Sequence, residues 1–304
     1  MSLRVVILGE PTGWHADRLA SAVADRGHAA TIVPWRKLTA TLDGSGESVG
    51  PSELDEADLV VVRGMPGSGR QADRLEEVIF RMNLLGRLAG KKTVINSPRS
   101  LEVAIDKHLS LCRIAAAGVP VPDTIVVQDV ASAREGWERL GCDCLLKPLF
   151  GSRGRGIVRI RSPDALEAAV VHAGNRDALG GVFYLQRFID HPGWDARILL
   201  VGEQVFAMRR RAAEGQWCTN ISSGGIGEPF VPPADWVDRA RQSAEAVGAE
   251  IAGIDLLPTD DGGVVVLEVN GVPGWRGLEG ATGADVTGAM VRYLEGPFST
   301  PRTA

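Results

Sequence analysis

The sequence has few of the features that mark secreted, zinc-binding or membrane proteins. Its 304 residues contain four cysteines and five scattered histidines, and the cysteines show neither zinc-site spacing nor a disulfide framework. No apolar run approaches the roughly 18 residues of a membrane span, and the first strand-like run, residues 3–9, is too short for a signal peptide. The net charge of −5 gives no sign of a nucleic-acid or membrane partner. These absences predict a cytoplasmic protein with reduced cysteines.

The composition, 44% hydrophobic and 23% charged, is that of an ordinary globular protein, and the length allows two or three domains. Residues 1–97 alternate strand and helix patterns, with strands predicted at 3–9, 30–33, 59–62 and 93–95 and helices at 14–26 and 71–89. The polar stretch 39–52, rich in Gly and Ser, is interpreted as a loop. This region is therefore predicted to be a small α/β domain with a mostly parallel sheet.

From residue 98 the pattern changes. Ser97 and Pro98 form a helix start, and that helix is predicted to run to residue 117 and to end at Gly118. Strands at 124–127, 144–148 and 157–160 then alternate with helices at 132–140 and 163–172, and a further strand begins at Val182. We predict an α/β fold class and three domains, 1–97, 98–180 and 181–304.

Two carboxylates on apolar strands give the sharpest local signal. Asp255 and Glu268 each lie in an apolar, strand-like run, and Asp261-Gly262 between the runs is a favoured two-residue hairpin turn. Counting back from that turn puts Asp255 opposite Glu268, with Asn270 on the same face as Glu268. Facing carboxylates repel one another and are costly to desolvate, and a divalent cation relieves both penalties; an all-oxygen set suits magnesium or manganese. The alternative is that one carboxylate points to solvent or pairs with an arginine.

Lys147 lies in an apolar run just before a glycine-rich loop, residues 151–156. The three glycines of this loop allow the backbone to approach a phosphate closely, and their N–H groups can form an anion-binding nest. Lys147 and the two arginines of the loop add positive charge. The pattern matches neither the Walker A motif nor the dinucleotide-binding motif, and a plain hairpin turn with solvated arginines is the alternative.

Three further segments are compatible with a nucleotide site, each with an ordinary alternative. Lys107 lies within a predicted helix, where a surface lysine is the commoner case. The backbone of residues 184–189 is able to hydrogen-bond an adenine edge, or else the segment is a core strand. Asp195 and Arg197 alternate on one predicted strand and therefore share a face.

Together, and in this order, these pieces resemble the ATP-grasp superfamily, and within it the RimK-type glutamate ligases. The resemblance covers about residues 97–295, and its matching stretches are Asn96-Ser97-Pro98 with Asp106-Lys107, Leu146-Lys147-Pro148 with the glycine loop, residues 186–189, Trp194-Asp195-Ala196-Arg197, Thr219-Asn220 with Gly224-Gly225, Gly253-Ile254-Asp255, and Glu268-Val269-Asn270 with Pro273-Gly274. The resemblance implies an α+β ATP-grasp fold preceded by a small Rossmann-like α/β domain.

The resemblance also implies roles for the matching residues. Lys107 and Lys147 would hold the ATP phosphates, and Asp195 would contact the ribose. Two Mg²⁺ ions, with Mn²⁺ as an alternative, would be held by Asp255, Glu268 and Asn270. The other implied ATP contacts are the loop residues Gly151, Ser152, Arg153, Gly154 and Gly156 and the adenine-contacting residues Gln186, Arg187, Phe188 and Ile189. The residues implied near the transferred phosphate or the acceptor carboxylate are Arg197, Arg210 and Asn220.

Two positions depart from the family pattern. Arg187 stands where many relatives have Glu, and Ser223 precedes Gly224-Gly225 where the ribosomal-protein ligases carry Arg. Residues 62–65, 80–85 and 271–278 resemble instead the tetrahydromethanopterin-linked α-L-glutamate ligases. In the last segment, Trp275 and Arg276 offer a flat, anionic acceptor an aromatic face beside a cation; the alternative is a packed Trp and a solvated Arg.

The activity that the resemblance implies is that of an ADP-forming ligase. An acceptor carboxylate would attack the γ-phosphate, and the amine of L-glutamate would then attack the acyl phosphate to form an amide, while the glycine loop closes as a lid that excludes water. The implied acceptor is a small molecule, a tetrahydromethanopterin-type pterin. Glutamylation of a ribosomal-protein C-terminus or another peptide is the alternative enzymatic hypothesis, and a non-catalytic nucleotide-binding module is the non-enzymatic one. The sequence leaves the oligomeric state open, a homo-oligomer included.

Overall fold

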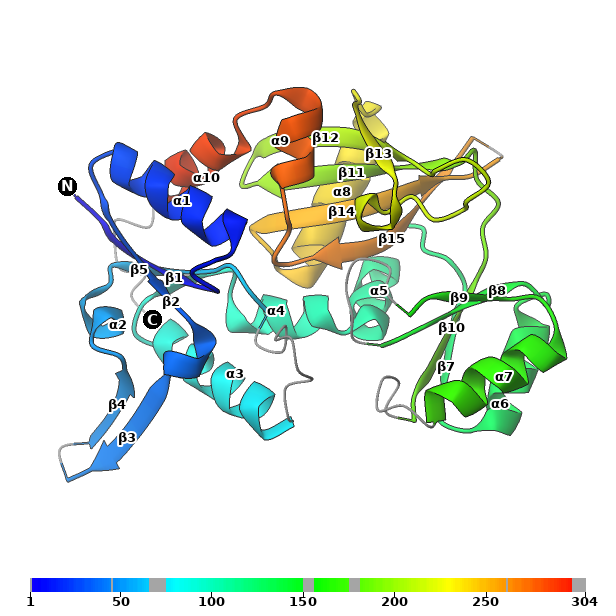
Figure 1. The fold of residues 1–304 in the computed structure, drawn as a ribbon, viewed down its shortest axis with the longest axis horizontal. Coiled ribbons are helices and arrows are strands. Elements are labelled where there is room, and N and C mark those ends of the chain that lie inside the picture. Colours follow the sequence, from blue (N-terminus) through cyan, green and yellow to red (C-terminus); the bar gives the residue numbers. More distant parts are fainter. Residues whose placement is uncertain are drawn as a thin grey trace.

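A computed structural model describes residues 2–44, 46–65, 75–149, 156–174, 181–260 and 262–296. These residues form three principal sheets and one two-stranded hairpin. Figure 1 shows the N-terminal sheet at one end of the molecule and the middle sheet at the other, with the C-terminal sheet between them. The N-terminal sheet is parallel and the other two are antiparallel, which confirms the predicted α/β class.

The N-terminal sheet has the strand order β2-β1-β5-β6, and all its strands are parallel. Its strands are β1 (Arg4–Leu8), β2 (Ala29–Val33), β5 (Leu59–Val62) and β6 (Thr93–Ile95), and its helices are α1 (Trp14–Asp25), α2 (Glu53–Glu56) and α3 (Leu75–Ala89), with a 3₁₀ turn η1 (Trp35–Lys37). All four residues of β5 are buried. Burial of both faces is typical of parallel sheets and explains why this strand reads as a continuous apolar run.

The polar stretch 39–52 is not the predicted loop. It contains an antiparallel hairpin of β3 (Thr39–Asp43) and β4 (Gly46–Gly50), which projects from the N-terminal sheet in Figure 1. Every residue of β3 is exposed. Its alternation of polar and apolar residues is only five residues long, and the Gly and Ser residues that follow favoured the loop interpretation.

The single helix predicted from residue 98 to 117 is two helices, α4 (Pro98–Ile105) and α5 (Lys107–Ala116). Asp106 between them has an extended backbone, and its carboxylate accepts hydrogen bonds from the N–H groups of His108 and Leu109. Asp106 is thus the N-cap of a second helix, a role that competes with helix continuation for this residue type. Lys107 consequently begins α5 instead of lying in mid-helix. The predicted start at Ser97 is confirmed, because its hydroxyl accepts a hydrogen bond from the Ser100 N–H.

The middle sheet is antiparallel, with the strand order β7-β10-β8-β9. Its strands are β7 (Thr124–Val127), β8 (Cys144–Lys147), β9 (Val158–Ile160) and β10 (Phe183–Arg187), and the helices α6 (Val130–Arg139) and α7 (Pro163–Gly174) lie against it. A small apolar core that includes Trp137 and Leu185 joins α6 to the sheet. These strands carry Lys147 and residues 184–187 of the predicted nucleotide site.

The C-terminal sheet is antiparallel, with the strand order β13-β12-β11-β14-β15. Its strands are β11 (Trp194–Val201), β12 (Gln204–Arg211), β13 (Ile226–Pro229), β14 (Ile251–Pro258) and β15 (Val264–Asn270), and its helical segments are η2 (Ile221–Ser223), α8 (Ala234–Val247), α9 (Arg276–Thr282) and α10 (Val286–Leu294). One apolar core packs α8 and α5 on this sheet, and a second joins α10 and β11 to α1 and β1. The N-terminal and C-terminal sheets therefore share a core.

The N-terminal sheet and its helices form one layer of the molecule, called the N-terminal layer below. Asn96 fixes this layer against the C-terminal sheet. Its side-chain amide donates to the carbonyl oxygens of Ile251 and Gly271, at 2.7 and 2.6 Å, and its side-chain oxygen accepts from the N–H groups of Glu250 and Ile251. All four bonds are buried or partly buried, and buried polar groups left unpaired are costly. The start of the loop after β15 is thereby held at the edge of the N-terminal sheet. None of the helices in the described ranges combines the length and apolar character needed to cross a bilayer.

Candidate functional site

Asp255 on β14 lies opposite Glu268 on β15, as predicted. The strand ends are paired one residue away from the predicted register, because Thr259 rather than Asp260 bonds Gly263. A bulge between Asp255 and Leu256 removes that offset, so the two carboxylates still face one another. Asp261 of the predicted turn lies outside the described residues.

Asp255 is buried in a network of two arginines. Arg197 donates two hydrogen bonds to its carboxylate, both at 2.7 Å, and Arg210 approaches it at 2.9 Å. Burial alone would raise the pKa of Asp255, but the charges of Arg197 and Arg210 outweigh it and hold that pKa well below its usual range. The arginine pairing that the sequence left open as an alternative is therefore present at Asp255.

Asp195 completes the network from β11. Arg210 donates to both its oxygens, at 2.7 and 2.5 Å, and the Thr219 hydroxyl donates to one of them at 2.7 Å. Burial would lower the pKa of Arg210, but Asp255 and Asp195 raise it, so this guanidinium is permanently charged. Both oxygens of Asp195 thus hold Arg210 and Thr219 in position, and Asp195 also lines the first cleft described below, so its predicted ribose contact stays a prediction.

Glu268 and Asn270 form the more accessible half of the predicted metal site. The Glu268 side chain is 31% exposed, and its Oε1 accepts a hydrogen bond of 3.0 Å from the Asn270 amide. Arg197 lies 3.9 Å from Glu268. No group of three His, Cys, Asp or Glu side chains suited to a metal occurs in the described residues, so a cation here would need the amide oxygen of Asn270 besides the two carboxylates. Two carboxylates and an amide oxygen are an appropriate donor set for Mg²⁺.

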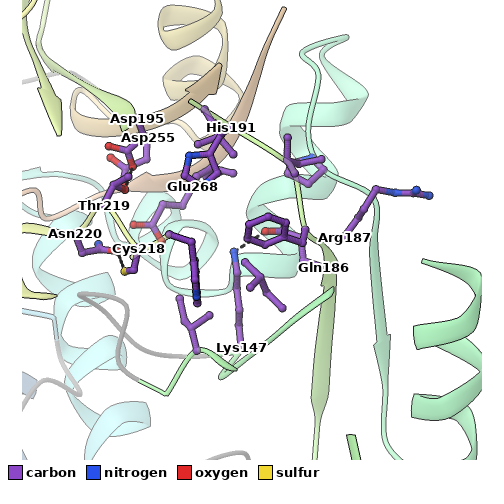
Figure 2. Close-up of a pocket in the computed structure, with 18 of the residues that line it drawn as sticks. Lys147, Gln186, Arg187, His191, Asp195, Cys218, Thr219, Asn220, Asp255 and Glu268 are labelled. Atoms are coloured by element: carbon purple, nitrogen blue, oxygen red, sulfur yellow. Dashed lines mark hydrogen bonds between the residues drawn. The ribbon is translucent and has the colours of Figure 1, made fainter. Parts of the chain in front are cut away.

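The two predicted phosphate lysines are both withdrawn from solvent. Lys147 donates to the Gln186 side chain at 2.5 Å, as the dashed line in Figure 2 shows, and Gln186 in turn donates to Thr124 and Tyr184. Burial lowers the pKa of Lys147 to about 8, although Glu268 opposes that shift. Burial also lowers the pKa of Lys107, whose ammonium donates to the Leu149 carbonyl at 3.3 Å. Lys107 is therefore not the surface lysine of the alternative interpretation, and Lys147 is also buried.

A cleft of about 820 Å³ lies between the middle and C-terminal sheets. Figure 2 shows Lys147 on one side of it, with Asp195, Asp255 and Thr219 on the other. Its apolar lining is formed by Pro122, Leu145, Ile157, Phe188, Ile189, Trp217, Leu257 and Leu267. A flat apolar slot with polar groups at one end is a suitable shape for a nucleotide base and its phosphates.

Arg187 contributes its backbone to this cleft but not its charge. Its side chain points away in Figure 2 and pairs with Asp123 on the outer surface, at 2.9 Å. The N–H groups of Arg187 and Phe188 are bonded to the carbonyls of Asp123 and Asp143. For the N–H of Ile189, no backbone acceptor is found in the described part of the chain, which leaves it for a base edge. The departure at Arg187 therefore has little bearing on the cleft.

The predicted glycine loop falls mostly outside the residues that the structure describes. Gly151, Ser152, Arg153 and Gly154 lie outside the described residues. Gly156 is described, with a φ of +74°, a conformation that favours glycine. The next residue, Ile157, lines the nucleotide-sized cleft.

A second cleft, of about 1780 Å³, opens toward the N-terminal layer. It shares Lys107, Arg210, Asn220 and Glu268 with the first, and Arg197, Asn270 and Arg276 also line it. Gly225 holds the Thr219–Asn220 turn close, since a Cβ there would overlap the Thr219 carbonyl. The two clefts therefore meet at one charged junction, to which the sequence had assigned all four shared residues.

Trp275 does not line the second cleft as predicted. It is completely buried, and its Nε1 donates to the Thr287 hydroxyl at 2.8 Å. Its ring packs on Trp14 and His15 of α1, so it offers no open face to a ligand. The sequence could not show this, because α1 is 260 residues away along the chain. Arg276 is exposed at the cleft, as predicted.

Sequence reasoning missed several residues of the two clefts. His15, Arg63 and Ser110 line the second cleft, and His191 and Cys218 line the first. A resemblance was noted at residues 62–65, but it gave Arg63 no role. No local pattern marks the others, because their positions depend on how the sheets pack together.

A family model, curated relatives and a solved structure all relate this chain to ATP-grasp ligases. A model of the RimK-like ATP-grasp domain matches residues 104–294. The chain is 31% identical to the tetrahydromethanopterin:alpha-L-glutamate ligase of Methanosarcina acetivorans, over 95% of this chain and 98% of the relative. It is 34% identical to a probable alpha-L-glutamate ligase of Mannheimia succiniciproducens, over 96% and 97%. The structure of the ATP-grasp ligase PsnB, complexed with a phosphomimetic variant of its minimal precursor, Mg and ADP, has the same fold, with a TM-score of 0.74, 21% identity, and coverage of 97% and 98%.

Proposed function

The chain belongs to the RimK-like ATP-grasp family of ligases, and we propose that it uses ATP to join L-glutamate to a carboxylate of a small-molecule acceptor, with ADP and phosphate as the other products. The observation that carries this proposal is the junction of the two clefts. Lys107, Arg210, Asn220 and Glu268 line both, so a phosphoryl group bound in the first cleft would meet a carboxylate bound in the second. The names of the relatives support L-glutamate as the amine and a tetrahydromethanopterin-type pterin as the acceptor.

ATP would occupy the first cleft with its base in the apolar slot. The Ile189 N–H would donate to the base edge, and Gln186 would orient Lys147 toward the phosphates. Lys107 would neutralise a second phosphate from the first turn of α5. The glycine loop would cover the phosphates as a lid. The three proposed domains would then divide the work: residues 98–180 would carry the lid, residues 181–304 would carry the catalytic groups, and residues 1–97 would border the acceptor.

The divalent cations of this family fit the donor set of Asp255, Glu268 and Asn270. PsnB is a relative in fold whose complex contains Mg and ADP, and we propose two Mg²⁺ ions here. When bound, they would neutralise phosphate charge and withdraw electrons from the γ-phosphorus. Arg197 and Arg210 hold the Asp255 carboxylate in place, and Asp195 fixes Arg210 in turn.

The reaction follows from these positions. An acceptor carboxylate oxygen would attack the γ-phosphorus while the bond to the β-phosphate oxygen breaks, and Lys147 and Arg210 would stabilise the charge that spreads over the transferred group. The amine of L-glutamate, once deprotonated, would then attack the acyl carbon and expel phosphate. Asn220 and Arg197 lie beside this second cleft and would orient the acceptor carboxylate.

The test of this function is ADP release with MgATP and L-glutamate while acceptors are added one at a time, with product masses measured in parallel. The acceptors are a tetrahydromethanopterin-type pterin and a glutamate-terminated peptide. A pterin product heavier by one glutamyl residue supports the proposal. A glutamylated peptide would support the alternative acceptor class, and ADP release that no acceptor stimulates would contradict a ligase acting on either.

A further inference from the structure

Three buried side-chain N or O atoms lack a hydrogen-bond partner in the described residues, and all three belong to residues that line the two clefts. They are Arg63 Nε and Ser110 Oγ in the second cleft and His191 Nδ1 in the first. Buried polar atoms in native proteins are nearly always paired, so an unpaired one calls for a reason. Their residues line the two clefts, so the unsatisfied atoms mark these walls as places where a bound ligand would change the local polar environment.

Arg63 is the most demanding of the three, because it carries a charge, is partly buried and has a buried Nε without a partner in the described residues. It follows β5 at the carboxyl end of the parallel sheet. Its guanidinium lies over the Trp275 ring, with 4.5 Å to the centroid, and one Nη donates to the Pro273 carbonyl at 2.8 Å. No carboxylate of the described residues forms an ion pair with it. Burial lowers the pKa of Arg63 to about 9, so an anion beside it would recover a large electrostatic penalty.

The other arginines of this cleft differ in their pairing. Arg197 and Arg210 are bonded to Asp255, whereas for Arg276 no ion pair is found in the described ranges. Arg276 is exposed and lies 5.6 Å from the Trp14 ring centroid. Arg63 and Arg276 are thus both arranged on the aromatic cluster of Trp14, His15 and Trp275. An arginine held on an aromatic ring presents its N–H fork in a fixed direction, which suits a planar, bidentate anion such as a carboxylate.

The N-terminal layer holds this arrangement in place. His15 Nε2 accepts hydrogen bonds from the N–H groups of Trp275 and Arg276, at 3.1 and 3.4 Å. The loop that leads into α9, whose first residue is Arg276, is therefore fastened to α1, and Arg63 donates to the Pro273 carbonyl of the same loop. Asn96 anchors the start of the loop at Gly271. The site is built before a ligand arrives.

We propose that Arg63, assisted by Arg276, forms a carboxylate-binding subsite in the second cleft, distinct from the junction where the phosphoryl group is transferred. This inference rests on the proposed function, because it assigns a second anionic contact to one of that reaction's two substrates. The carboxylate belongs either to the acceptor, which then carries another besides the one that is activated, or to L-glutamate. The N-terminal layer thereby acts in substrate recognition and not only in support of the fold.

The kinetic test compares wild type with Arg63→Gln, Arg63→Lys and the control Arg36→Gln, whose arginine is exposed and pairs with Glu10 away from both clefts. Arg63→Gln should raise the KM of one substrate about 10- to 100-fold, the loss expected for a hydrogen-bonded charge pair, with kcat and the KM of ATP nearly unchanged. Arg63→Lys should recover part of that loss, and Arg36→Gln should show none. A raised KM for glutamate or for the acceptor identifies the owner of the carboxylate. Unchanged KM values for both substrates in Arg63→Gln would overturn the proposal.

A binding test separates this proposal from the proposed function. Glutaric acid should raise the melting temperature of wild type more than 4-carbamoylbutanoic acid, in which one carboxyl group is an amide. Arg63→Gln should abolish that difference while it keeps the shift produced by MgATP, which shows that the variant is folded. This result would support the subsite even if no acceptor in the ADP-release panel reacts. An intact preference for glutaric acid in Arg63→Gln would contradict it even if the ligase activity is established.

Discussion

Titration of Lys147 should be visible in ATP binding. The ammonium is buried against Gln186, and its pKa is lowered from 10.5 to about 8. A bound phosphate favours the charged form, so ATP binding should return the pKa of Lys147 toward its ordinary value. The affinity for ATP should therefore fall as the pH rises above 8, because the free lysine then loses its proton before the bound one does.

The size of the effect follows from the two pKa values. If the bound lysine has its ordinary pKa of 10.5, the ATP affinity should fall about 30-fold from about pH 7 to about pH 9.5, with uptake of roughly 0.9 proton per ATP near pH 9. Lys107, whose pKa burial also lowers, acts in the same direction. In the ligand-free protein, the contribution of Lys147 to the free energy of unfolding changes with pH in the opposite direction to the ATP affinity. Between pH 8 and 10.5 the unfolded lysine keeps a proton that the native one has lost, so Lys147 makes the free energy of unfolding rise with pH.

The assay is isothermal titration of the protein with MgATP at several pH values, in two buffers of different ionisation enthalpy. The difference in apparent enthalpy gives the proton uptake directly. Lys147→Met should bind ATP about 10- to 100-fold more weakly at neutral pH and should lose most of the uptake near pH 9. An ATP affinity that is level from pH 7 to 9.5, or full uptake in Lys147→Met, would refute the reasoning.

Three further predictions concern single carboxylates and one arginine. Glu268→Gln should lower the rate of ADP formation at least about 1000-fold, yet shift the melting temperature by only a few degrees, because this side chain is 31% exposed; near-normal turnover would exclude it from the metal site. Asp255→Asn should cost about 3–5 kcal/mol in the free energy of unfolding, because it removes the buried carboxylate partner of Arg197 and one of the two buried carboxylate partners of Arg210; denaturant titration that shows less than about 1 kcal/mol would argue against the network. Arg187→Ala should leave the ATP dissociation constant within about twofold, since its exposed side chain pairs only on the outer surface; a tenfold change would show that the side chain reaches the nucleotide.

The sequence predicted those features that depend on local periodicity and turn chemistry. The register of Asp255 against Glu268 was predicted by counting back from the assumed turn, and it was right although the strand ends pair one residue away, because a bulge compensated for that residue. The strand at 59–62 was also predicted correctly, because a buried parallel strand is a continuous apolar run. The hairpin at 39–50 escaped prediction because its strands are short and the segment is rich in Gly and Ser, with Val49 as the one buried residue of β3 and β4, and the break at Asp106 did so because an apolar pattern continues through it.

Features that depend on how the layers pack lie beyond any local pattern. Arg63 and His15 reach the second cleft because the N-terminal sheet and α1 are held against the C-terminal sheet, partly by Asn96, whereas Ser110 reaches it from α5. The burial of Trp275 has the same cause. For Arg63 and Trp275 the family resemblance gave the position of a motif but not the direction of the side chains.

The central claim, activation of a carboxylate as an acyl phosphate, is tested most directly by isotope transfer. The acceptor that stimulates ADP release is prepared with both oxygens of its carboxylate labelled with ¹⁸O, and the phosphate released during a complete turnover with MgATP and L-glutamate is analysed by mass. Attack of the carboxylate on the γ-phosphorus followed by amide formation predicts one ¹⁸O in each phosphate and one in each amide. Unlabelled phosphate, or ¹⁸O found in AMP, would contradict the account.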